Sequence, residues 1–309
     1  MKSPARLLLV RHFRRPTGGN IKLRDYFLHA AAHPAIEAEL WFASGGEAAE
    51  SDIWRDLDPR HHARDPSLAD YQFVCVNGKD WSLLPADMGS AEILHFVQHA
   101  GYLDDPVLRS YLARPAHRLC TTAALRDAIL PVANGPVTVV PVGVADAFFA
   151  EPEQARDVKV TIIGTKQPAF AAEFADRLRA LGLAPVVVGE SWLAHSDMAA
   201  LFRSTEILVP LPLPIEGFFL PALEGMAAGC VVITNDAIGN RGHCIAGETC
   251  LLPRRGDIDA HVSAIIQALD CTDLRQRLVE GGRRVAAQHS MAAERAAFHA
   301  FLDRALRQH

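Results

Sequence analysis

The stretch at 206–235 constrains the fold of this chain most, because it spells a strand, a loop, a helix and a second strand in direct succession. An apolar run at 207–209 meets a proline-rich segment at 210–214. A helix is predicted from Leu220, with Pro221 in its first turn, where a missing N–H has no consequence. Gly229 then ends this helix, and the next strand is predicted at 231–233. The pattern is typical of a βαβ unit.

The start of the predicted helix suits an anion. A helix N-terminus presents free backbone N–H groups and the positive end of the helix dipole, which together favour phosphate. Glu216 lies in the loop before the helix and Glu224 about one turn inside it. A carboxylate at 224 would lie near the anion without taking its place, so it suits neutral hydroxyls such as those of a ribose.

The run at 216–229, EGFFLPALEGMAAG, resembles the E-x7-E signature of the family 4 retaining glycosyltransferases of the GT-B fold, the glycosyl transferases group 1. The two glutamates, Pro221 and the Met226-Ala227 pair all have the spacing of that signature. The other interpretation is an ordinary helix with two surface glutamates.

The resemblance implies roles for this segment. Glu216 would act in catalysis by orienting the hydroxyls of the donor sugar, and Glu224 would hold the ribose. One departure is Phe219, which stands where the family has a second glycine and is expected to narrow the donor-sugar pocket. The backbone N–H groups that would stabilise charge on the diphosphate belong to Gly217, Phe218, Phe219 and Leu220.

Length and composition bound the class of protein. At 309 residues, 50% hydrophobic and 22% charged, the chain is long enough for two globular domains. A net charge of −5 argues against a general nucleic-acid partner. No apolar run could span a bilayer, and the run at 7–10 is too short for a signal peptide, so we expect a cytoplasmic protein. The six cysteines include no C-x-x-C pair and predict neither disulfides nor a zinc site, and the richness in Ala, Arg and Leu is associated with a bacterial source.

The order of elements predicts an α/β fold. Continuous apolar strands alternate with helices, as parallel sheets covered on both faces require. With the resemblance, this implies a GT-B fold of two Rossmann-like domains facing each other across a cleft. Residues 1–141 would form an acceptor-side domain and residues 142–289 the donor-binding domain. A final helix at 290–309 would pack back on the first domain.

Two further segments bear on the diphosphate. Gly18 and Gly19 precede a helix predicted from Ile21 to about Ala32, and they would let a donor approach the backbone closely, although a plain tight turn is as common. Thr165 stands where the family has an arginine, which leaves Lys166 as the nearby cation. Lys166 would therefore neutralise the diphosphate alone or with help from arginines at 11, 14, 15 or 241.

Four histidines between residues 61 and 99 are predicted to have different roles. His99 follows a strand predicted at 92–97, and the resemblance implies that it reaches the donor sugar and acts in catalysis. His95, inside the strand, is predicted to be a packed core residue. The pair His61-His62 lacks a third ligand at metal spacing, which favours a solvent loop.

The N-terminal segment is basic. Residues 1–30 hold seven Lys and Arg against a single acid. This cluster is either a solvated basic face or a site for an anionic acceptor or a membrane surface. The candidate acceptor-side residues are Arg11, Arg14, Arg15 and Asn20.

The implied activity is a retaining, metal-independent hexosyl transfer from a nucleotide-diphosphate sugar, with no cofactor. The acceptor would be a growing glycan, a lipid-linked or other anionic molecule, or a small molecule, and contact with the inner membrane face is possible. One alternative is a non-catalytic GT-B homologue that binds nucleotide or partners an active transferase. A second is a dinucleotide oxidoreductase, against which no G-x-G-x-x-G follows the first strand. Asp257-Ile258-Asp259 spells D-x-D, a metal motif of another transferase fold, but its position predicts a helix cap.

Overall fold

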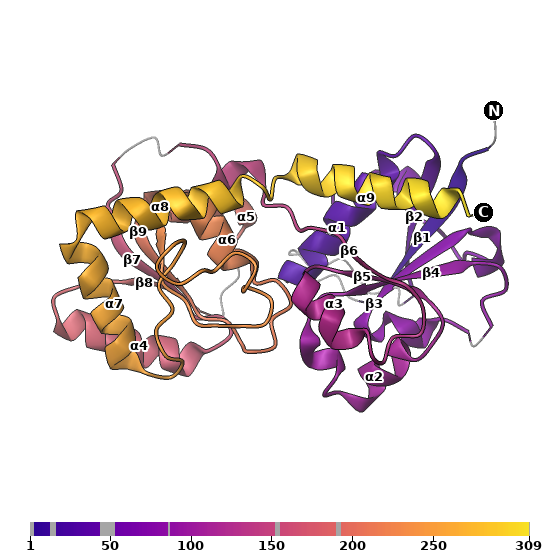
Figure 1. The fold of residues 1–309 in the computed structure, drawn as a ribbon. Helices are drawn as coiled ribbons and strands as arrows, with labels where there is room; N and C mark the ends of the chain where they lie inside the picture. The colour runs from indigo at the N-terminus through magenta and orange to yellow at the C-terminus, as the bar shows by residue number, and fades with distance from the viewer. Residues whose placement is uncertain are drawn as a thin grey trace. The chain divides into compact units, whose positions relative to one another are not determined.

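The computed structural model describes residues 3–12, 17–43, 53–85, 87–151, 155–189 and 193–308. It divides into two compact units (Figure 1). Unit 1 comprises Met1–Pro141 and Glu294–His309, and unit 2 comprises Val142–Ala293. Within the described ranges, no helix is long and apolar enough to cross a bilayer.

Unit 1 is built on a parallel sheet with the strand order β2-β1-β3-β4-β5-β6. Its strands are β1 (Ala5–Arg11), β2 (Ile36–Phe42), β3 (Phe73–Asn77), β4 (Glu92–Val97), β5 (His117–Cys120) and β6 (Val137–Val139). Its helices are α1 (Gly18–Ala31), α2 (Pro106–Leu112), α3 (Ala123–Ile129) and, from Glu294 onward, α9 (Met291–Leu306). Short 3-10 turns are η1 (Pro59–His61), η2 (Leu68–Asp70), η3 (Gly78–Leu83) and η4 (Ala100–Tyr102).

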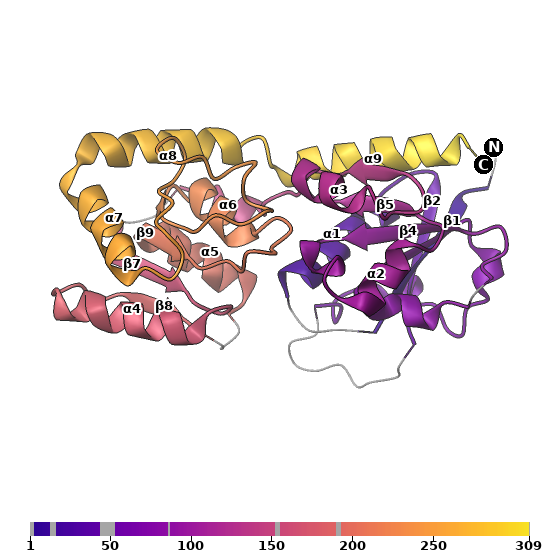
Figure 2. The same ribbon diagram turned by 60° about the horizontal axis from the view of Figure 1, so that its bottom comes forward.

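Both faces of this sheet are covered, because side chains of a strand alternate between the faces. Leu7 and Leu9 of β1 belong to a core cluster with α1 and α9, whereas Leu8 and Val10 belong to one with η3. Helices α2 and α3 pack in a third cluster with the ends of β4 and β5. In both ribbon views the C-terminal helix α9 runs along unit 1 (Figures 1 and 2).

Unit 2 is built on a parallel sheet with the strand order β10-β9-β7-β8. The strands are β7 (Val158–Ile163), β8 (Val186–Val188), β9 (Thr205–Pro210) and β10 (Val231–Val232). The helices are α4 (Pro168–Ala180), α5 (His195–Ser204), α6 (Leu220–Ala227), α7 (Ile258–Asp270) and α8 (Thr272–Ala286), and η5 (Asp146–Phe148) is a 3-10 turn.

Side chains of β9 alternate between the two faces of the sheet in unit 2, and different helices cover each face. Ile207 and Val209 face a core cluster that includes α4 and α7, which lie side by side in Figure 2. Leu208 faces the cluster that holds α5 and α6. Helix α6 therefore lies against the sheet with its first turn near the end of β9, where the proline-rich segment turns the chain.

The predicted elements of the central βαβ unit are confirmed. The apolar run 207–209 lies in β9, α6 begins at Leu220, and Gly229 follows the helix with a φ of +75°. The first helix of the chain differs from its prediction, since α1 begins at Gly18 and not at Ile21. Thr17 is its N-cap and accepts a hydrogen bond from the Asn20 backbone N–H at 3.3 Å. The pair Gly18-Gly19 is therefore the first turn of a helix and not a loop.

Candidate functional site

The loops after β7 and β9 of unit 2 bring Lys166 and Glu216 together. Ile163 and Pro210 are register partners at the ends of these parallel strands, so the segments that follow them leave the same edge of the sheet. Lys166 Nζ lies 3.7 Å from Glu216 Oε1. The lysine side chain is 52% exposed and the glutamate side chain 18% exposed. The structure thus places a cation and a half-buried carboxylate at the edge where α/β sheets bind ligands.

Glu216 has spare hydrogen-bonding capacity. Its Oε1 atom is buried and accepts no hydrogen bond from any residue in the described part of the chain. The 3.7 Å separation from Lys166 is an ion pair without a hydrogen bond. A buried carboxylate oxygen without a hydrogen-bond donor is costly.

Close backbone packing fixes the segment that carries Glu216. A Cβ added to Gly239 would lie 2.1 Å from the Gly217 carbonyl carbon and 2.3 Å from the Phe218 nitrogen. Ile238 N also donates to Pro214 O at 3.1 Å. The loop that holds Gly239 therefore lies directly on the segment before α6, and glycine is the residue that permits this approach.

Phe219 is the N-cap of α6 and has a φ of +61° and a ψ of +67°. This is the left-handed region, which favours glycine, so the position where the family has glycine keeps a glycine-like backbone here. The Phe219 side chain is 7% exposed and belongs to the core cluster of α5 and α6. The ring therefore packs mainly in the core, and its expected narrowing of the donor-sugar pocket stays a prediction.

Glu224 lies in the second turn of α6 and is nearly buried. Its Oε1 lies 3.0 Å from Nε2 of His195, the first residue of α5. His195 was not among the predicted site residues. Nothing local in the sequence pairs two side chains 29 residues apart, and the contact exists because α5 and α6 pack on the same face of the sheet.

Thr165 stands where the resembling family has an arginine, so the other cations at this edge of unit 2 are of interest. Arg241 forms a two-point pair with Asp236, at 2.9 and 2.7 Å, and this pair lowers the pKa of the Asp236 carboxyl. Arg255, which sequence reasoning missed, donates to the carbonyl oxygens of Pro212 and Asp236, the latter at 2.6 Å. Burial lowers the pKa of Arg255. Arg255 therefore brings a third cation to the ends of β9 and β10.

In unit 1 the predicted residues gather where β1, β3 and β4 end. Arg11 Nη2 donates to Asn20 Oδ1 at 2.6 Å. Gln98 Nε2 donates to Gly19 O at 3.0 Å, and Asn77 Nδ2 donates to Gln98 Oε1 at 3.1 Å. A Cβ on Gly19 would lie 2.7 Å from Gln98 Oε1, whereas one on Gly18 would meet no atom of the described residues within 4 Å. Gly19 therefore serves internal packing.

Arg11 does not belong to an exposed basic face. Its side chain is 2% exposed and forms an ion pair with Asp80, whose side chain is fully buried. Burial lowers the pKa of Arg11 and raises the pKa of Asp80. Lys22 is also buried, 2.6 Å from Glu294 and 2.8 Å from Asp25. The expectation of an acceptor-binding or solvated role is therefore wrong for these two cations, and Arg14 and Arg15 lie outside the described residues.

The histidines of unit 1 fall into different surroundings. His99 is half-buried after β4, with its ring 5.0 Å from the Tyr102 ring. His95 is fully buried, 3.2 Å from the Tyr102 hydroxyl, and burial lowers its pKa, which confirms a packed core histidine.

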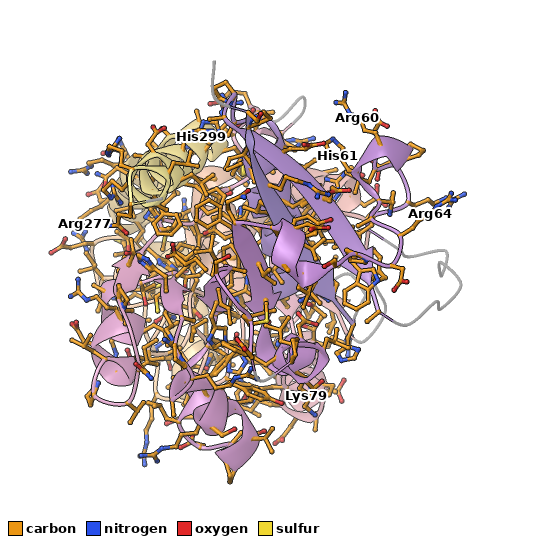
Figure 3. All side chains as sticks on the ribbon, turned by 90° about the vertical axis from the view of Figure 1, so that its right-hand side faces the viewer. Arg60, His61, Arg64, Lys79, Arg277 and His299 are labelled. Atoms are coloured by element: carbon orange, nitrogen blue, oxygen red, sulfur yellow. The ribbon has the colours of Figure 1, made fainter. Side chains whose placement is uncertain are left out.

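His61 is not in a solvent loop. It lies on η1, its Nδ1 is 2.8 Å from Ala38 O, and its ring contacts Phe27 edge-on. Arg60 and Arg64 beside it point away from the sheet (Figure 3). Across the described ranges, no three His, Cys, Asp or Glu side chains are grouped as a metal site requires.

Comparisons with known proteins agree with this geometry. Residues 143–285 match the model of the family described as Glycosyl transferases group 1. The MMP alpha-(1->4)-mannosyltransferase of Mycolicibacterium hassiacum is 28% identical over 170 residues, which are 53% of this chain. The match spans only 39% of the length of that relative.

Two solved structures share the fold over nearly the whole chain. Sucrose-phosphate synthase from Thermosynechococcus elongatus has a TM-score of 0.75 at 15% identity and covers 99% of this chain and 100% of its own. Anabaena HepE in complex with UDP-glucose has a TM-score of 0.76 at 12% identity and covers 96% of this chain and 99% of its own. Identities this low show a shared fold, which is GT-B. The match to the glycosyl transferases group 1 model, over residues 143–285, covers the segment that holds Lys166, Glu216 and Glu224.

Proposed function

We propose that this protein transfers a sugar from a nucleotide-diphosphate sugar to an acceptor, with retention at the anomeric carbon. The observation that carries the proposal is the approach of Lys166 to Glu216 at the entrance to α6, with Glu224 in the next turn. A cation, a carboxylate with an unsatisfied oxygen and a helix N-terminus together match the parts of such a donor. That HepE was crystallised with UDP-glucose supports a nucleotide sugar as the donor.

The donor would be held by groups with distinct tasks. Lys166 and the N–H groups from Gly217 to Leu220 would face the diphosphate, whose charge grows as the bond to the sugar breaks. Glu216 would accept hydrogen bonds from sugar hydroxyls through its carboxylate, and Glu224 from those of the ribose. Thr165, beside Lys166, is neutral and would offer a hydroxyl to the phosphate. Arg255 is a further cation at the ends of β9 and β10.

The proposed reaction needs no protein nucleophile. The bond between the anomeric carbon and the phosphate oxygen breaks, and the acceptor oxygen bonds to the same face of that carbon. The acceptor proton passes to the departing phosphate oxygen, so the products are the glycosylated acceptor and the nucleoside diphosphate. Transition-state stabilisation then depends on fixed charges and dipoles, which act without reorganising during the reaction.

The acceptor is proposed to bind unit 1, where β1, β3 and β4 end. Gly18, Asn20 and His99 lie at these strand ends, and Lys79 follows β3 as an exposed cation. A glycan, a lipid-linked molecule or another anionic acceptor would suit a cation there. A lipid-linked acceptor would also bring the protein to a membrane surface.

Two measurements test the proposal. Thermal shift with UDP, GDP and ADP should show stabilisation by at least one nucleoside diphosphate, since a ligand that binds the native state raises the melting temperature. NMR of the transfer or hydrolysis product should show the anomeric configuration of the donor. Binding without any turnover of nucleotide sugars would instead favour the non-catalytic homologue, and inversion would contradict retention.

Metal independence is part of the proposal. Lys166 and the helix N–H groups supply positive charge where a divalent ion would otherwise act. Transfer should therefore persist in excess EDTA. Activity that EDTA abolishes and Mg²⁺ or Mn²⁺ restores would contradict this part alone.

A further inference from the structure

The imidazole of His195 donates a hydrogen bond to the carboxylate of Glu224. Its Nε2 lies 3.0 Å from Glu224 Oε1, and within the described part of the chain no other side chain contacts this carboxylate through a hydrogen bond. The imidazole is 39% exposed, whereas the glutamate side chain is 8% exposed. His195 therefore reaches from the rim of the site to a carboxylate that water hardly touches.

The imidazole is held from a second side. The Phe148 ring, in η5, contacts it edge-on with the ring centroids 5.0 Å apart. Phe148 is itself fully buried and packs against Phe202 of α5. The ring of His195 thus contacts a buried aromatic ring as well as the carboxylate.

This arrangement restricts the Glu224 carboxylate. A carboxylate has two oxygens that accept hydrogen bonds in preferred directions, and a fixed donor on one oxygen sets the direction of the other. A hydrogen bond that involves a charged group is stronger and more directional than a neutral one. Without the donor, a nearly buried carboxylate would lose both this orientation and part of its stabilisation.

We propose that His195 is the positioning residue of the ribose subsite: it holds Oε1 of Glu224 so that Oε2 faces a ribose hydroxyl of the bound nucleotide. The inference rests on the proposed function, because it takes Glu224 as the ribose ligand. It adds a residue whose effect depends on the ribose hydroxyls and not on the base or the phosphates.

The test uses two variants that differ in a single property. His195→Phe keeps a ring against Phe148 but removes the N–H donor, whereas His195→Gln supplies an amide N–H. Ser196→Ala, an exposed neighbour in the same helical turn, is the control. Calorimetry on the intact protein measures Kd for the best-bound of UDP, GDP and ADP and for its 2′-deoxy and 3′-deoxy forms.

Wild type should bind the ribonucleotide about tenfold tighter than at least one deoxy form, as expected for one hydrogen bond to a charged group. His195→Phe should reduce this ratio to about one by weakening the ribonucleotide alone, with partial recovery in His195→Gln and no change in Ser196→Ala.

Other outcomes separate the two proposals. If His195→Phe keeps the wild-type ratio, or weakens ribonucleotide and deoxynucleotide binding equally, His195 does not position the ribose ligand and the inference is overturned while nucleotide binding stands. If wild type binds none of the three diphosphates saturably, the proposed function fails and the inference fails with it.

Discussion

Lys166 Nζ lies 3.7 Å from Glu216 Oε1, a distance that joins the loop after β7 to the segment before α6. The two groups attract each other but share no hydrogen bond, and the lysine side chain is 52% exposed. Each therefore keeps capacity for a ligand, the lysine for an anion and the glutamate for hydroxyls. The pair is the point of unit 2 at which a phosphate and a sugar would both find partners.

Removing the lysine should weaken nucleotide binding. Lys166→Ala should raise the Kd for a nucleoside diphosphate about ten- to hundredfold, because a hydrogen bond between charged groups contributes roughly 1.5–3 kcal/mol. Calorimetry at low and high salt measures this, and the difference should shrink as salt screens the charge. Lys159→Ala is the control, since Lys159 is 57% exposed and pairs with Glu206. Equal Kd values for both variants and wild type would remove Lys166 from the site.

Substitutions of Glu216 and Glu224 should have different effects on turnover and on nucleotide binding. Glu224→Gln should raise the nucleotide Kd, because the amide loses the charge that strengthens bonds from ribose hydroxyls. Glu216→Ala should lower turnover more than nucleotide affinity, because the native Glu216 carboxylate would contact the donor sugar and not the nucleotide. Steady-state kinetics and calorimetry on the same preparations distinguish these effects. Identical behaviour of the two variants would refute the division of roles.

Gly239 should tolerate no side chain. In Gly239→Ala the new Cβ would lie 2.1 Å from the Gly217 carbonyl carbon, so the segment that carries Glu216 must shift. We expect a destabilisation of about 1–3 kcal/mol, as for other overpacked sites, and a larger loss of turnover. Urea unfolding and donor hydrolysis measure the two effects. Gly242→Ala, where a Cβ would meet no atom of the described part of the chain within 4 Å, should be nearly silent, and a similar loss there would contradict the packing argument.

The buried His243 should make the folded protein less stable as the pH falls. This residue is 1% exposed, and burial lowers its pKa from 6.5 to about 3. Below pH 6.5 His243 binds a proton in the unfolded chain but stays neutral in the folded protein. The free energy of unfolding therefore decreases as the pH falls from 6.5 toward 3. The loss is about 1.4 kcal/mol per pH unit. Urea unfolding of wild type and His243→Gln at pH 7, 6 and 5 tests this, and the variant should lose less stability on acidification. Parallel profiles would show that another group dominates.

The basic segment before α1 should act on the acceptor alone. Charge removal in the double variant Arg14→Ala, Arg15→Ala should raise the acceptor KM and leave the nucleotide-sugar affinity intact, an effect that salt should weaken. Lys79→Ala tests the exposed cation after β3 in the same assay. His99→Ala should instead lower transfer and donor hydrolysis together. An unchanged acceptor KM in the double variant at low salt would assign these arginines to a solvated basic face.

The elements around the candidate site could be predicted because their signals are local. Prolines at 210–214 stop an apolar run, Pro221 suits a first helical turn, and Gly229 takes the positive φ that ends the helix. Each of these preferences depends on a few neighbouring residues, so β9, α6 and β10 follow from the sequence. The spacing of Glu216 and Glu224 around the start of that helix follows as well.

Side-chain partnerships could not be predicted in the same way. Arg11 and Asp80 are 69 residues apart and meet because β1 and β3 are adjacent in the sheet, which turns an apparent surface cation into a buried one. His195 meets Glu224 because α5 and α6 share a face of another sheet. The φ of +61° at Phe219 likewise depends on how the core accepts its ring. Local patterns thus account for the elements around the candidate site and for where the two glutamates stand, because hydrophobic period, caps and turns are short-range properties. Which charges are buried and which side chains meet depends on strand order and helix packing, because these bring together residues that no local pattern connects.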